Sequence, residues 1–436
     1  MPNIAAMISF EQLKVEAARL DAADTLANMR EEYLFPQRNG KDVLYFTGNS
    51  LGLQPKGVKQ ALIQECDDWA RYGVEGHMLA ERPWFSYHEQ FAAPSARLVG
   101  ALPHEVVVMN QLTVNLHVLL TTFYRPAGKR VKILFEQKPF PSDQYAFESQ
   151  AHLHGLDPVE VLVELPYSEG LSYHTTEDIE RAINALGDEL ALVCFGGVNY
   201  FTGQLFDMQR ITAAAHAVGA YAGFDLAHAA GNALLQLHDW KVDFACWCSY
   251  KYLNSGPGGV SGVYIYEDHT RNASLLRLAG WWGHDKATRF QMKNGFVPIP
   301  TAESWQLSNA PIMSMAVHRV ALDLFDQVGM AALRAKSEQL TDFLERVLMT
   351  VKSETGWALE VLTPSDPAAR GCQLSVVLPG KDRSFVKILA EAGAVVDWRE
   401  PNVIRLAPVP MYNRYMDVFE LGQLLLALAE RRSKSM

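Results

Sequence analysis

Asp225 and Lys251 are the residues of this chain whose types and surroundings best fit covalent chemistry. Asp225 ends the apolar run 220–224 within GFDLAHAAGN, and Lys251 follows the apolar run 244–248 within DFACWCSYKYLNSGPGG. Near-continuous apolar runs of this kind are typical of buried strands. Open α/β sheets bind ligands at the carboxyl edge of their strands. The pair therefore predicts a cofactor that carries an electrophile. The amine of Lys251 would capture the electrophile, and the carboxylate of Asp225 would hold the opposite side of the cofactor.

Pyridoxal phosphate fits that description, and the surroundings of both residues support it. Trp247, Tyr250 and Tyr252 give Lys251 an apolar setting, which favours a neutral amine. Asp225 would bind the protonated pyridine nitrogen, because a buried acid needs a cationic partner. The alternative for Asp225 is an N-cap for the helix that AHAAGNAL could form.

The cofactor and its substrate need three further features. Phe140 in KPFPSD offers an aromatic ring to lie on the pyridine. Leu112 and Thr113, where a helix begins, together with the hydroxyl of Tyr250, are expected to hold the phosphate, although Thr113 could simply be the N-cap. Arg405 in NVIRLAP is a charge on a short apolar strand and is expected to bind a substrate carboxylate, with a structural salt bridge as the alternative.

The order of the predicted elements indicates an α/β fold. The strands VKILFE, VEVLVEL, LALVCF and AYAGFD alternate with helical segments, which predicts a mostly parallel sheet of the seven-stranded type, with VSGVYIY as its antiparallel edge. The helix after Gly57 carries an apolar face of Leu62, Ile63, Cys66 and Trp69. We expect an N-terminal helical segment at 1–45 that docks on the small domain, a large cofactor-binding domain at 46–315 and a smaller C-terminal α/β domain at 316–436.

Composition excludes several classes of function. Of 436 residues, 49% are hydrophobic and 20% charged, and a net charge of −10 argues against binding of nucleic acid or an anionic membrane. The chain has no apolar run of membrane-spanning length, and MPNIAAMISFEQ lacks the features of a signal peptide. Its five cysteines lie mostly in apolar runs, which predicts reduced buried thiols in a cytoplasmic protein and no metal site.

These motifs closely resemble the kynureninase family, which are pyridoxal-phosphate hydrolases of fold type I, related to class V aminotransferases. The resemblance covers nearly the whole chain and is carried by YFTGNSLGLQPK, GHMLAERPW, MNQLTVNLHVLL, FPSDQYA, GGVNYFTGQLFD, GFDLAHAAGN, DFACWCSYKYLNSGPGG, GWWGH, WQLSNAPI and VIRLAP. It implies hydrolytic cleavage of the Cβ–Cγ bond of L-kynurenine or 3-hydroxy-L-kynurenine, which yields L-alanine and anthranilate or 3-hydroxyanthranilate. The pathways implied are tryptophan catabolism by the kynurenine pathway and NAD biosynthesis.

The resemblance also implies roles for residues of this sequence. Lys251 would hold the cofactor and remove the Cα proton, Asp225 would bind the ring nitrogen, and Tyr250 would be the acid that protonates the departing alanine. The other implied cofactor contacts are Leu112, Thr113, Phe140, Ser142, Asp143 and His228, with Trp281 and Asn309 supplied by the neighbouring subunit of a homodimer.

Substrate contacts are implied for Ser50, His77, Asn309 and Arg405. His77 and Asn309 resemble the pairing in members that favour 3-hydroxykynurenine, since both could hydrogen-bond a ring hydroxyl. Gly196 departs from those members that begin the segment with Ser, so a hydroxyl near the cofactor is missing.

Two other classes of protein remain as alternatives. A class V aminotransferase or a cysteine desulfurase would use the same cofactor, but a desulfurase needs a mobile, exposed cysteine, for which Cys372 is the loose candidate. A non-enzymatic protein built on this fold would be expected to lack Lys251 or Asp225, and both are present.

Overall fold

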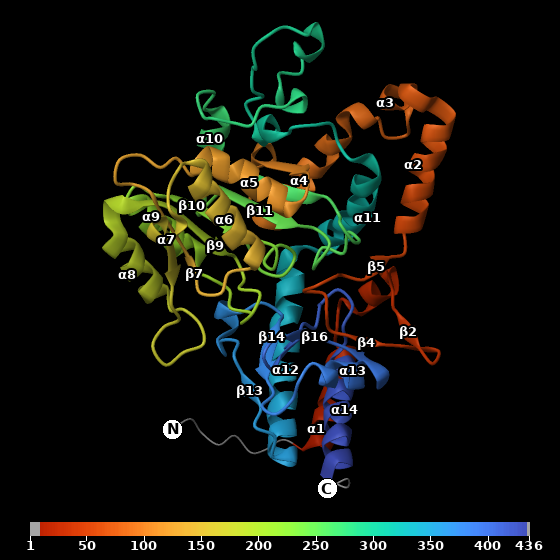
Figure 1. Ribbon diagram of the computed structural model, residues 1–436. Helices are drawn as coiled ribbons and strands as arrows, with labels where there is room; N and C mark the ends of the chain where they lie inside the picture. Colours follow the sequence, from red (N-terminus) through yellow and green to blue (C-terminus); the bar gives the residue numbers. More distant parts are fainter. Residues whose placement is uncertain (1–8, 434–436) are drawn as a thin grey trace. The chain divides into compact units, whose positions relative to one another are not determined.

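The computed structural model describes residues 9–433 (Figure 1). By their internal contacts these residues form two compact units. The larger unit contains residues 57–200 and 205–330, and the smaller unit contains residues 9–56, 201–204 and 331–433. Each unit buries its own hydrophobic core.

The larger unit is built on a seven-stranded sheet, which confirms the predicted α/β fold class. The strand order is β6-β12-β11-β10-β9-β7-β8. The strands are β6 (Val106–Met109), β7 (Lys132–Glu136), β8 (Leu162–Leu165), β9 (Leu190–Gly196), β10 (Tyr221–Asp225), β11 (Phe244–Cys248) and β12 (Ser261–Ile265). The pairs from β8 to β11 are parallel. Both faces are covered, since β6, β10 and β11 are buried at nearly every position.

β12 is antiparallel to its neighbours, as predicted, but its expected place at the edge of the sheet is wrong. The strand β6 pairs with its outer side, from Ser261 opposite Met109 to Tyr264 opposite Val106. β6 is a run of only VVVM directly before a helix. A run this short is not distinguished from the start of a buried helix by periodicity.

The larger unit also contains α-helices, several of which pack against the sheet. They are α2 (Val58–Tyr72), α3 (Gly76–Leu79), α4 (Ala92–Val99), α5 (Leu112–Phe123), α6 (Pro141–Leu153), α7 (Pro158–Val161), α8 (Thr176–Leu186), α9 (Met208–Ala217), α10 (Glu267–Arg271) and α11 (Ile312–Val328). The helix α8 begins after Thr175 and α9 after Asp207, because each of these side chains accepts a backbone N–H of the first turn. Within residues 9–433, no helix is both long and apolar enough to cross a membrane.

The apolar face predicted for α2 points outward. Ile63 and Trp69 are 40% and 63% exposed, whereas the polar residues Glu65 and Asp68 are buried. Glu65 accepts hydrogen bonds from Trp84 Nε1 at 3.0 Å and from a tyrosine hydroxyl, and Asp68 accepts one from a backbone N–H. Because their partners lie inside the unit, the polar face of α2 turns inward and its apolar face stays at the surface.

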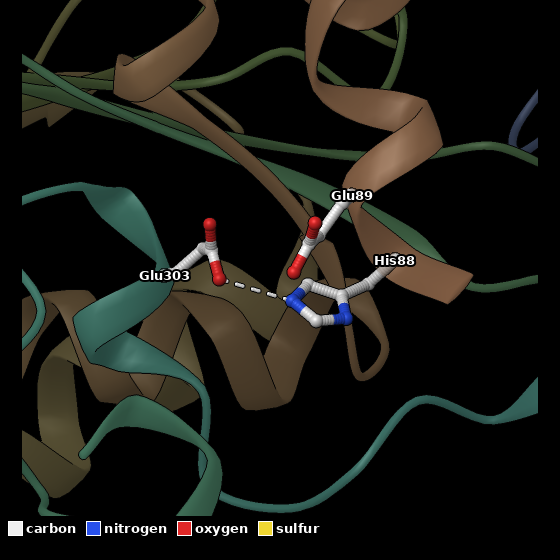
Figure 2. Close-up of side chains that lie close together, drawn as sticks. All are labelled: His88, Glu89 and Glu303. Atoms are coloured by element: carbon white, nitrogen blue, oxygen red, sulfur yellow. Dashed lines mark hydrogen bonds and ion pairs between the residues drawn. The ribbon is translucent and has the colours of Figure 1, made fainter. Parts of the chain in front are cut away.

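The segment between β12 and α11 is mostly irregular and is tied to η3 (Trp84–Phe91) by a polar cluster (Figure 2). His88 Nε2 lies 3.0 Å from Glu303, and Trp282 Nε1 donates to its Nδ1 at 3.5 Å. Lys286 bridges Glu89 and Glu303 at 2.8 and 2.9 Å. Burial alone would raise the pKa of Glu303, but hydrogen bonds from His88 and Lys286 outweigh it and lower that pKa. The cluster therefore fixes this segment, which carries Trp281.

The smaller unit has an antiparallel four-stranded sheet in the order β13-β14-β17-β16. Its strands are β13 (Glu360–Val361), β14 (Leu374–Val377), β16 (Asp397–Arg399) and β17 (Val403–Leu406). A parallel pair joins β4 (Leu44–Tyr45) to β15 (Ala394–Val395), and the short pairs β1–β5 and β2–β3 span Tyr33–Leu34, Gln54–Pro55, Gln37–Arg38 and Lys41–Asp42. Its helices are α1 (Phe10–Ala22), α12 (Met330–Thr355), α13 (Ser384–Glu391) and α14 (Tyr415–Ser433).

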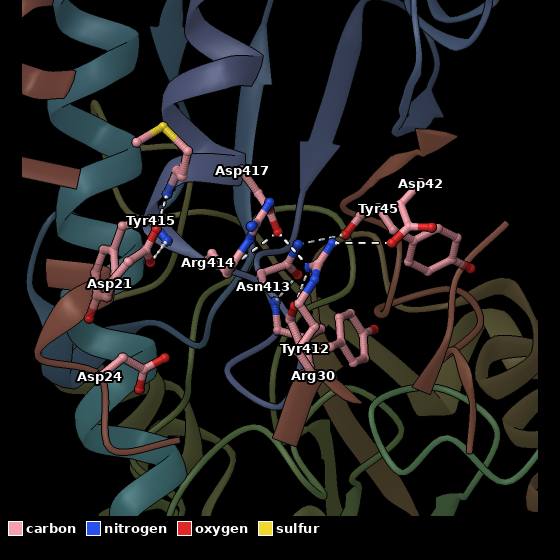
Figure 3. Close-up of polar contacts among 12 residues, drawn as sticks. Asp21, Asp24, Arg30, Asp42, Tyr45, Tyr412, Asn413, Arg414, Tyr415 and Asp417 are labelled. Atoms are coloured by element: carbon pink, nitrogen blue, oxygen red, sulfur yellow. Dashed lines mark hydrogen bonds and ion pairs between the residues drawn. The ribbon is translucent and has the colours of Figure 1, made fainter. Parts of the chain in front are cut away.

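The N-terminal segment contacts the start of α14 through a polar network (Figure 3). Asp21 accepts the backbone N–H groups of Tyr415 at 2.8 Å and Met416 at 3.0 Å, which are free donors at a helix start. Arg30 donates to Asp417 at 2.9 Å. Burial raises the pKa of Asp21, although the two N–H groups oppose the shift. Asp21, in the N-terminal segment, thus caps the start of α14.

The division between the units differs from the expected domain boundaries. Residues up to Lys56, rather than 45, group with the smaller unit, because the β4–β15 and β1–β5 pairs form within it. The second boundary falls after Met330 rather than near 315, because α11 packs against α2 and α4 of the larger unit.

Four of the five cysteines are buried, as the sequence predicts, and Cys66 on the outward face of α2 is exposed. Cys372, the loose candidate for a reactive cysteine, is fully buried in the smaller unit.

Candidate active site

A cavity opens where the carboxyl ends of β7, β9, β10 and β11 meet the start of α5. Parallel strands end at the same edge of the sheet, so their last residues and the loops after them converge there. Most of the residues that the sequence singled out for the cofactor line this cavity: Leu112, Thr113, Phe140, Ser142, Asp143, Asp225, His228, Tyr250 and Lys251.

Lys251 presents its amine to this cavity. Its Nζ lies 3.0 Å from Nε2 of His228 and 5.7 Å from the centre of the Phe140 ring. The ring of Tyr250 is on another side, with its centre 5.9 Å from Nζ. An amine held between a histidine nitrogen and aromatic rings has a defined position for capture of an electrophile.

Buried carboxyl groups face that amine. Burial raises the pKa of Asp225, although the charge of Lys251 opposes the shift. Burial also raises the pKa of Asp143 well above its usual value, and the charges of Asp225 and Glu136 add to it. Asp225 accepts the backbone N–H of Ala227 at 2.7 Å, so it caps the turn after β10 as well as facing the cavity.

This charge distribution fits pyridoxal phosphate. Among the described residues, Oδ1 of Asp143 is buried without a hydrogen-bond partner. Buried acids that face a single ammonium group call for a further cation or donor. The protonated ring nitrogen of the cofactor would provide both beside Asp225.

The start of α5 offers a site for the phosphate. The helix begins at Leu112 with Gln111 as its N-cap, and no side chain caps it. Thr113 is therefore inside the first turn and is not the N-cap that the sequence left open. Its hydroxyl lies 2.8 Å from that of Ser142, in the first turn of α6. Hydroxyl groups and uncapped N–H groups at a helix start bind anions.

Phe140 is placed to cover a flat ring. Its side chain is 44% exposed, and Tyr200 packs edge-on against it, with ring centres 5.3 Å apart. An aromatic face braced from one side and open on the other favours stacking.

Sequence reasoning missed some residues of the cavity. Glu136, Val198, Tyr200 and Ala227 also line it. The signal for Glu136 was available, because it is an acid that closes a buried apolar strand, as Asp225 does.

Three expected residues of the larger unit are not part of this lining. Within the described part of the chain, His77, Trp281 and Asn309 lie outside the set of residues around the cavity. Trp281 is 47% exposed and Asn309 is exposed, while His77 Nδ1 lies 2.9 Å from the carbonyl oxygen of Val74. One chain therefore presents Trp281 and Asn309 at its surface.

Two expected substrate contacts belong to the smaller unit. Ser50 is exposed in the turn after β4. Arg405 is only 1% exposed and forms an ion pair with Asp397, its cross-strand neighbour on β16. The salt bridge that the sequence left open for Arg405 is present, and Arg399 contacts the same carboxylate at 3.3 Å.

The His88 cluster is the place in the described residues where three side chains come close enough to hold a metal ion, with Glu89 and Glu303. Lys286 already lies between the two glutamates, so their charges are balanced by an ammonium group.

Solved structures share this fold. The cystine C–S lyase C-DES, in complex with cysteine persulfide, gives a TM-score of 0.75 at 19% identity and covers 88% of this chain and 97% of that one. The cysteine desulfurase CsdA from Escherichia coli gives 0.74 at 17% identity, with coverages of 94% and 99%. These structures show that the chain has fold type I, an architecture of pyridoxal-phosphate enzymes.

Sequence relatives identify the family. Kynureninase of Flavobacterium johnsoniae is 52% identical, over 96% of this chain and 98% of the relative. Kynureninase of Myxococcus xanthus is 51% identical, over 95% and 97%. Residues 333–425 match the kynureninase C-terminal domain. The chain belongs to the kynureninase family.

Proposed function

We propose that the protein hydrolyses the Cβ–Cγ bond of L-kynurenine or its 3-hydroxy form, releasing L-alanine and anthranilate or 3-hydroxyanthranilate. The observation that carries the proposal is the meeting of Lys251, Asp225 and Asp143 in one cavity of a chain from this family. Pyridoxal phosphate, when bound, supplies an aldehyde that captures an amine and a ring that accepts the electron pair released at Cα.

The residues of the cavity have separate tasks. Lys251 takes the Cα proton of the substrate, and His228, 3.0 Å from its Nζ, orients the amine. Asp225, with Asp143 beside it, would hold the ring nitrogen of the cofactor protonated. Phe140 would cover the ring, and the start of α5 would bind the phosphate.

Tyr250 is the proton donor in this scheme. Burial raises the pKa of its phenol, so the hydroxyl stays protonated at neutral pH. Water adds to the side-chain carbonyl carbon of the substrate, the Cβ–Cγ bond breaks with its electron pair on Cβ, and Cβ then takes a proton. A neutral phenol next to Lys251 is suited to give that proton.

Product formation tests the function directly. Adding L-kynurenine to the purified protein with its cofactor is expected to produce anthranilate, followed by its fluorescence. If His77 and Asn309 bind a ring hydroxyl, kcat/KM for 3-hydroxykynurenine should exceed that for kynurenine by about tenfold, the value of one good hydrogen bond. A strong preference for the unsubstituted ring would remove that role, and absence of product from both compounds would contradict the function.

Arg405 is proposed to bind the substrate carboxylate. Arg405→Lys should lower kcat/KM about 10- to 100-fold, mostly through KM, because lysine cannot make the bidentate contact. Arg399→Lys is the matched control, since Arg399 contacts the same Asp397 and is 34% exposed; it should change kcat/KM less than about twofold. A lower Tm in Arg405→Lys with unchanged kcat/KM would mean that Arg405 has only a structural role, through its salt bridge with Asp397.

A homodimer with shared sites is proposed for the assembly. Exposed apolar side chains on the segment of Trp281, including Phe290 at 56% and Met292 at 73%, support it, as does the outward face of α2. Large exposed apolar patches mark interfaces. In this arrangement Trp281 and Asn309 complete the cavity of the neighbouring subunit, and the mass in solution measures the assembly.

A place in tryptophan catabolism and NAD biosynthesis in the cytoplasm is part of the same proposal. The products belong to that chemistry, and free, mostly buried cysteines are usual in a reducing compartment. The desulfurase alternative has no support from Cys372, because a fully buried thiol cannot reach a substrate.

A further inference from the structure

Glu136 is a buried acid in the cavity to which the proposed chemistry assigns no task. It is the last residue of β7, is 4% exposed and lines the cavity with Asp225 and Lys251. Its Oε1 accepts the backbone N–H of Gly196 at 3.0 Å. A Cβ at position 196 would lie 3.0 Å from the same oxygen, so the carboxyl group takes up the space beside this glycine.

The groups around Glu136 are mainly acidic. The titratable side chains that act on it or line the same cavity are Asp143 on α6, Glu164 on β8, Tyr167 after β8, Cys194 on β9, Tyr200 after β9, Asp225 on β10, His228 after β10, and Tyr250 and Lys251 after β11. The carboxyl groups of this set outnumber its ammonium group. A second ionised acid next to Asp225 would therefore be repelled.

We propose that Glu136 acts as a neutral carboxylic acid in the cofactor site, where its hydroxyl donates a hydrogen bond to the bound cofactor and its other oxygen anchors Gly196. This inference rests on the proposed cofactor site. The neutral form fits these contacts, because one oxygen accepts from the Gly196 N–H while the other oxygen of this cavity-lining residue would carry the proton that it donates. Glu136 thereby supplies an O–H group at the wall where Gly196 has none.

The electrostatics agree with this geometry. Burial raises the pKa of Glu136 to about 7, and the charges of Asp225 and Glu164 add to the shift while backbone N–H groups oppose it. A carboxyl group that keeps its proton up to neutral pH can act as a donor there, as a buried acid does in other enzymes.

The test compares Glu136→Gln with wild type in the full-length protein with bound cofactor. Glutamine keeps the shape, an accepting oxygen and a donating group, but it cannot titrate. The visible absorption of the wild-type cofactor should shift with an apparent pKa at or above about 7, and Glu136→Gln should lack that shift. Glu164→Gln is the matched control, because it removes an exposed acid near Glu136; it should keep the transition but move it to slightly lower pH, since the charge of Glu164 adds to the raised pKa of Glu136.

Thermal unfolding over the same pH range gives a second readout. The folded protein binds the proton of Glu136 more tightly than the unfolded chain does, so the stability of wild type should fall as pH rises from about 4.5 to about 7. That fall should be smallest in Glu136→Gln, whereas Glu164→Gln should keep most of it. Glu136→Ala should weaken cofactor binding about tenfold by loss of the donor, whereas Glu136→Gln should stay within about twofold of wild type.

The outcomes separate this inference from the function. If Glu136→Gln keeps the wild-type absorption transition and the wild-type dependence of Tm on pH, the carboxyl group has only a structural role and the inference is wrong. If wild type forms no anthranilate but the transition depends on Glu136, the proposed function fails and the inference stands. A wild-type protein that retains no cofactor would overturn both.

Discussion

Replacement of Lys251 with alanine is expected to reduce anthranilate formation by at least about 10,000-fold. The variant would lose the group proposed to hold the cofactor covalently and to take the Cα proton. Its Nζ lies between His228 and the rings of Phe140 and Tyr250, and the cavity lining contains no other lysine among the described residues. Lys241→Ala, an exposed lysine of the same unit, serves as the control and should retain wild-type activity.

Two measurements make the Lys251 result specific. After borohydride reduction, mass spectrometry should find the cofactor on the Lys251 peptide of wild type and on no peptide of the variant. Mixing Lys251→Ala with Trp281→Ala, each inactive alone, should restore about a quarter of wild-type activity, because about half of the dimers would be mixed and each mixed dimer would contain one intact site of two. Near wild-type turnover by Lys251→Ala would contradict the assignment, and failure of the mixture to recover activity would contradict shared sites.

Asp225→Asn is expected to lower kcat by about 100- to 1,000-fold at saturating cofactor. Asparagine keeps the shape and can still accept the Ala227 N–H, but it has no charge to hold the ring nitrogen protonated. The electron pair released at Cα is then poorly accommodated, so the loss appears in kcat more than in KM. Steady-state kinetics, together with the absorption spectrum of the bound cofactor, measure this effect.

The Asp225 prediction has a close control. Asp239→Asn removes an exposed acid of the same unit and should leave kcat unchanged. A change in kcat of less than about threefold in Asp225→Asn would mean that another group protonates the ring, and Asp143, which shares the cavity, would be the next residue to replace.

The convergence of Asp225 and Lys251 in one cavity was predictable because Asp225 ends a buried apolar strand and Lys251 closely follows another. Asp225 and Lys251 stand out against β10 and β11, and their convergence follows from the parallel sheet. Glu136 ends β7 as Asp225 ends β10. It was not predicted, because Phe140 in the following loop was the more obvious candidate for a cofactor contact.

The sequence alone does not reveal contacts between residues that are far apart along the chain. The face of α2 that carries Glu65 points to the interior because Trp84 and Tyr87 donate hydrogen bonds to Glu65. Helical periodicity does not reveal such partners. The pairing of Arg405 with Asp397 depends on the register between β16 and β17. Both features are set by tertiary contacts that outweigh local pattern.

The discontinuous composition of the smaller unit has a consequence for synthesis of the protein. The larger unit lies almost entirely within one continuous stretch of chain, so it can fold while the ribosome is still producing α12. The smaller unit cannot fold completely at that stage. Asp21 accepts N–H groups of α14, and α14 is translated only after α12. Until α12 and α14 have been translated, α1 lacks the helices that share its core cluster, to which Leu13 and Ala17 belong, and the partner of Glu16, Arg346 on α12. Truncation before α14 is therefore expected to leave the larger unit folded and α1 without its contacts to α14.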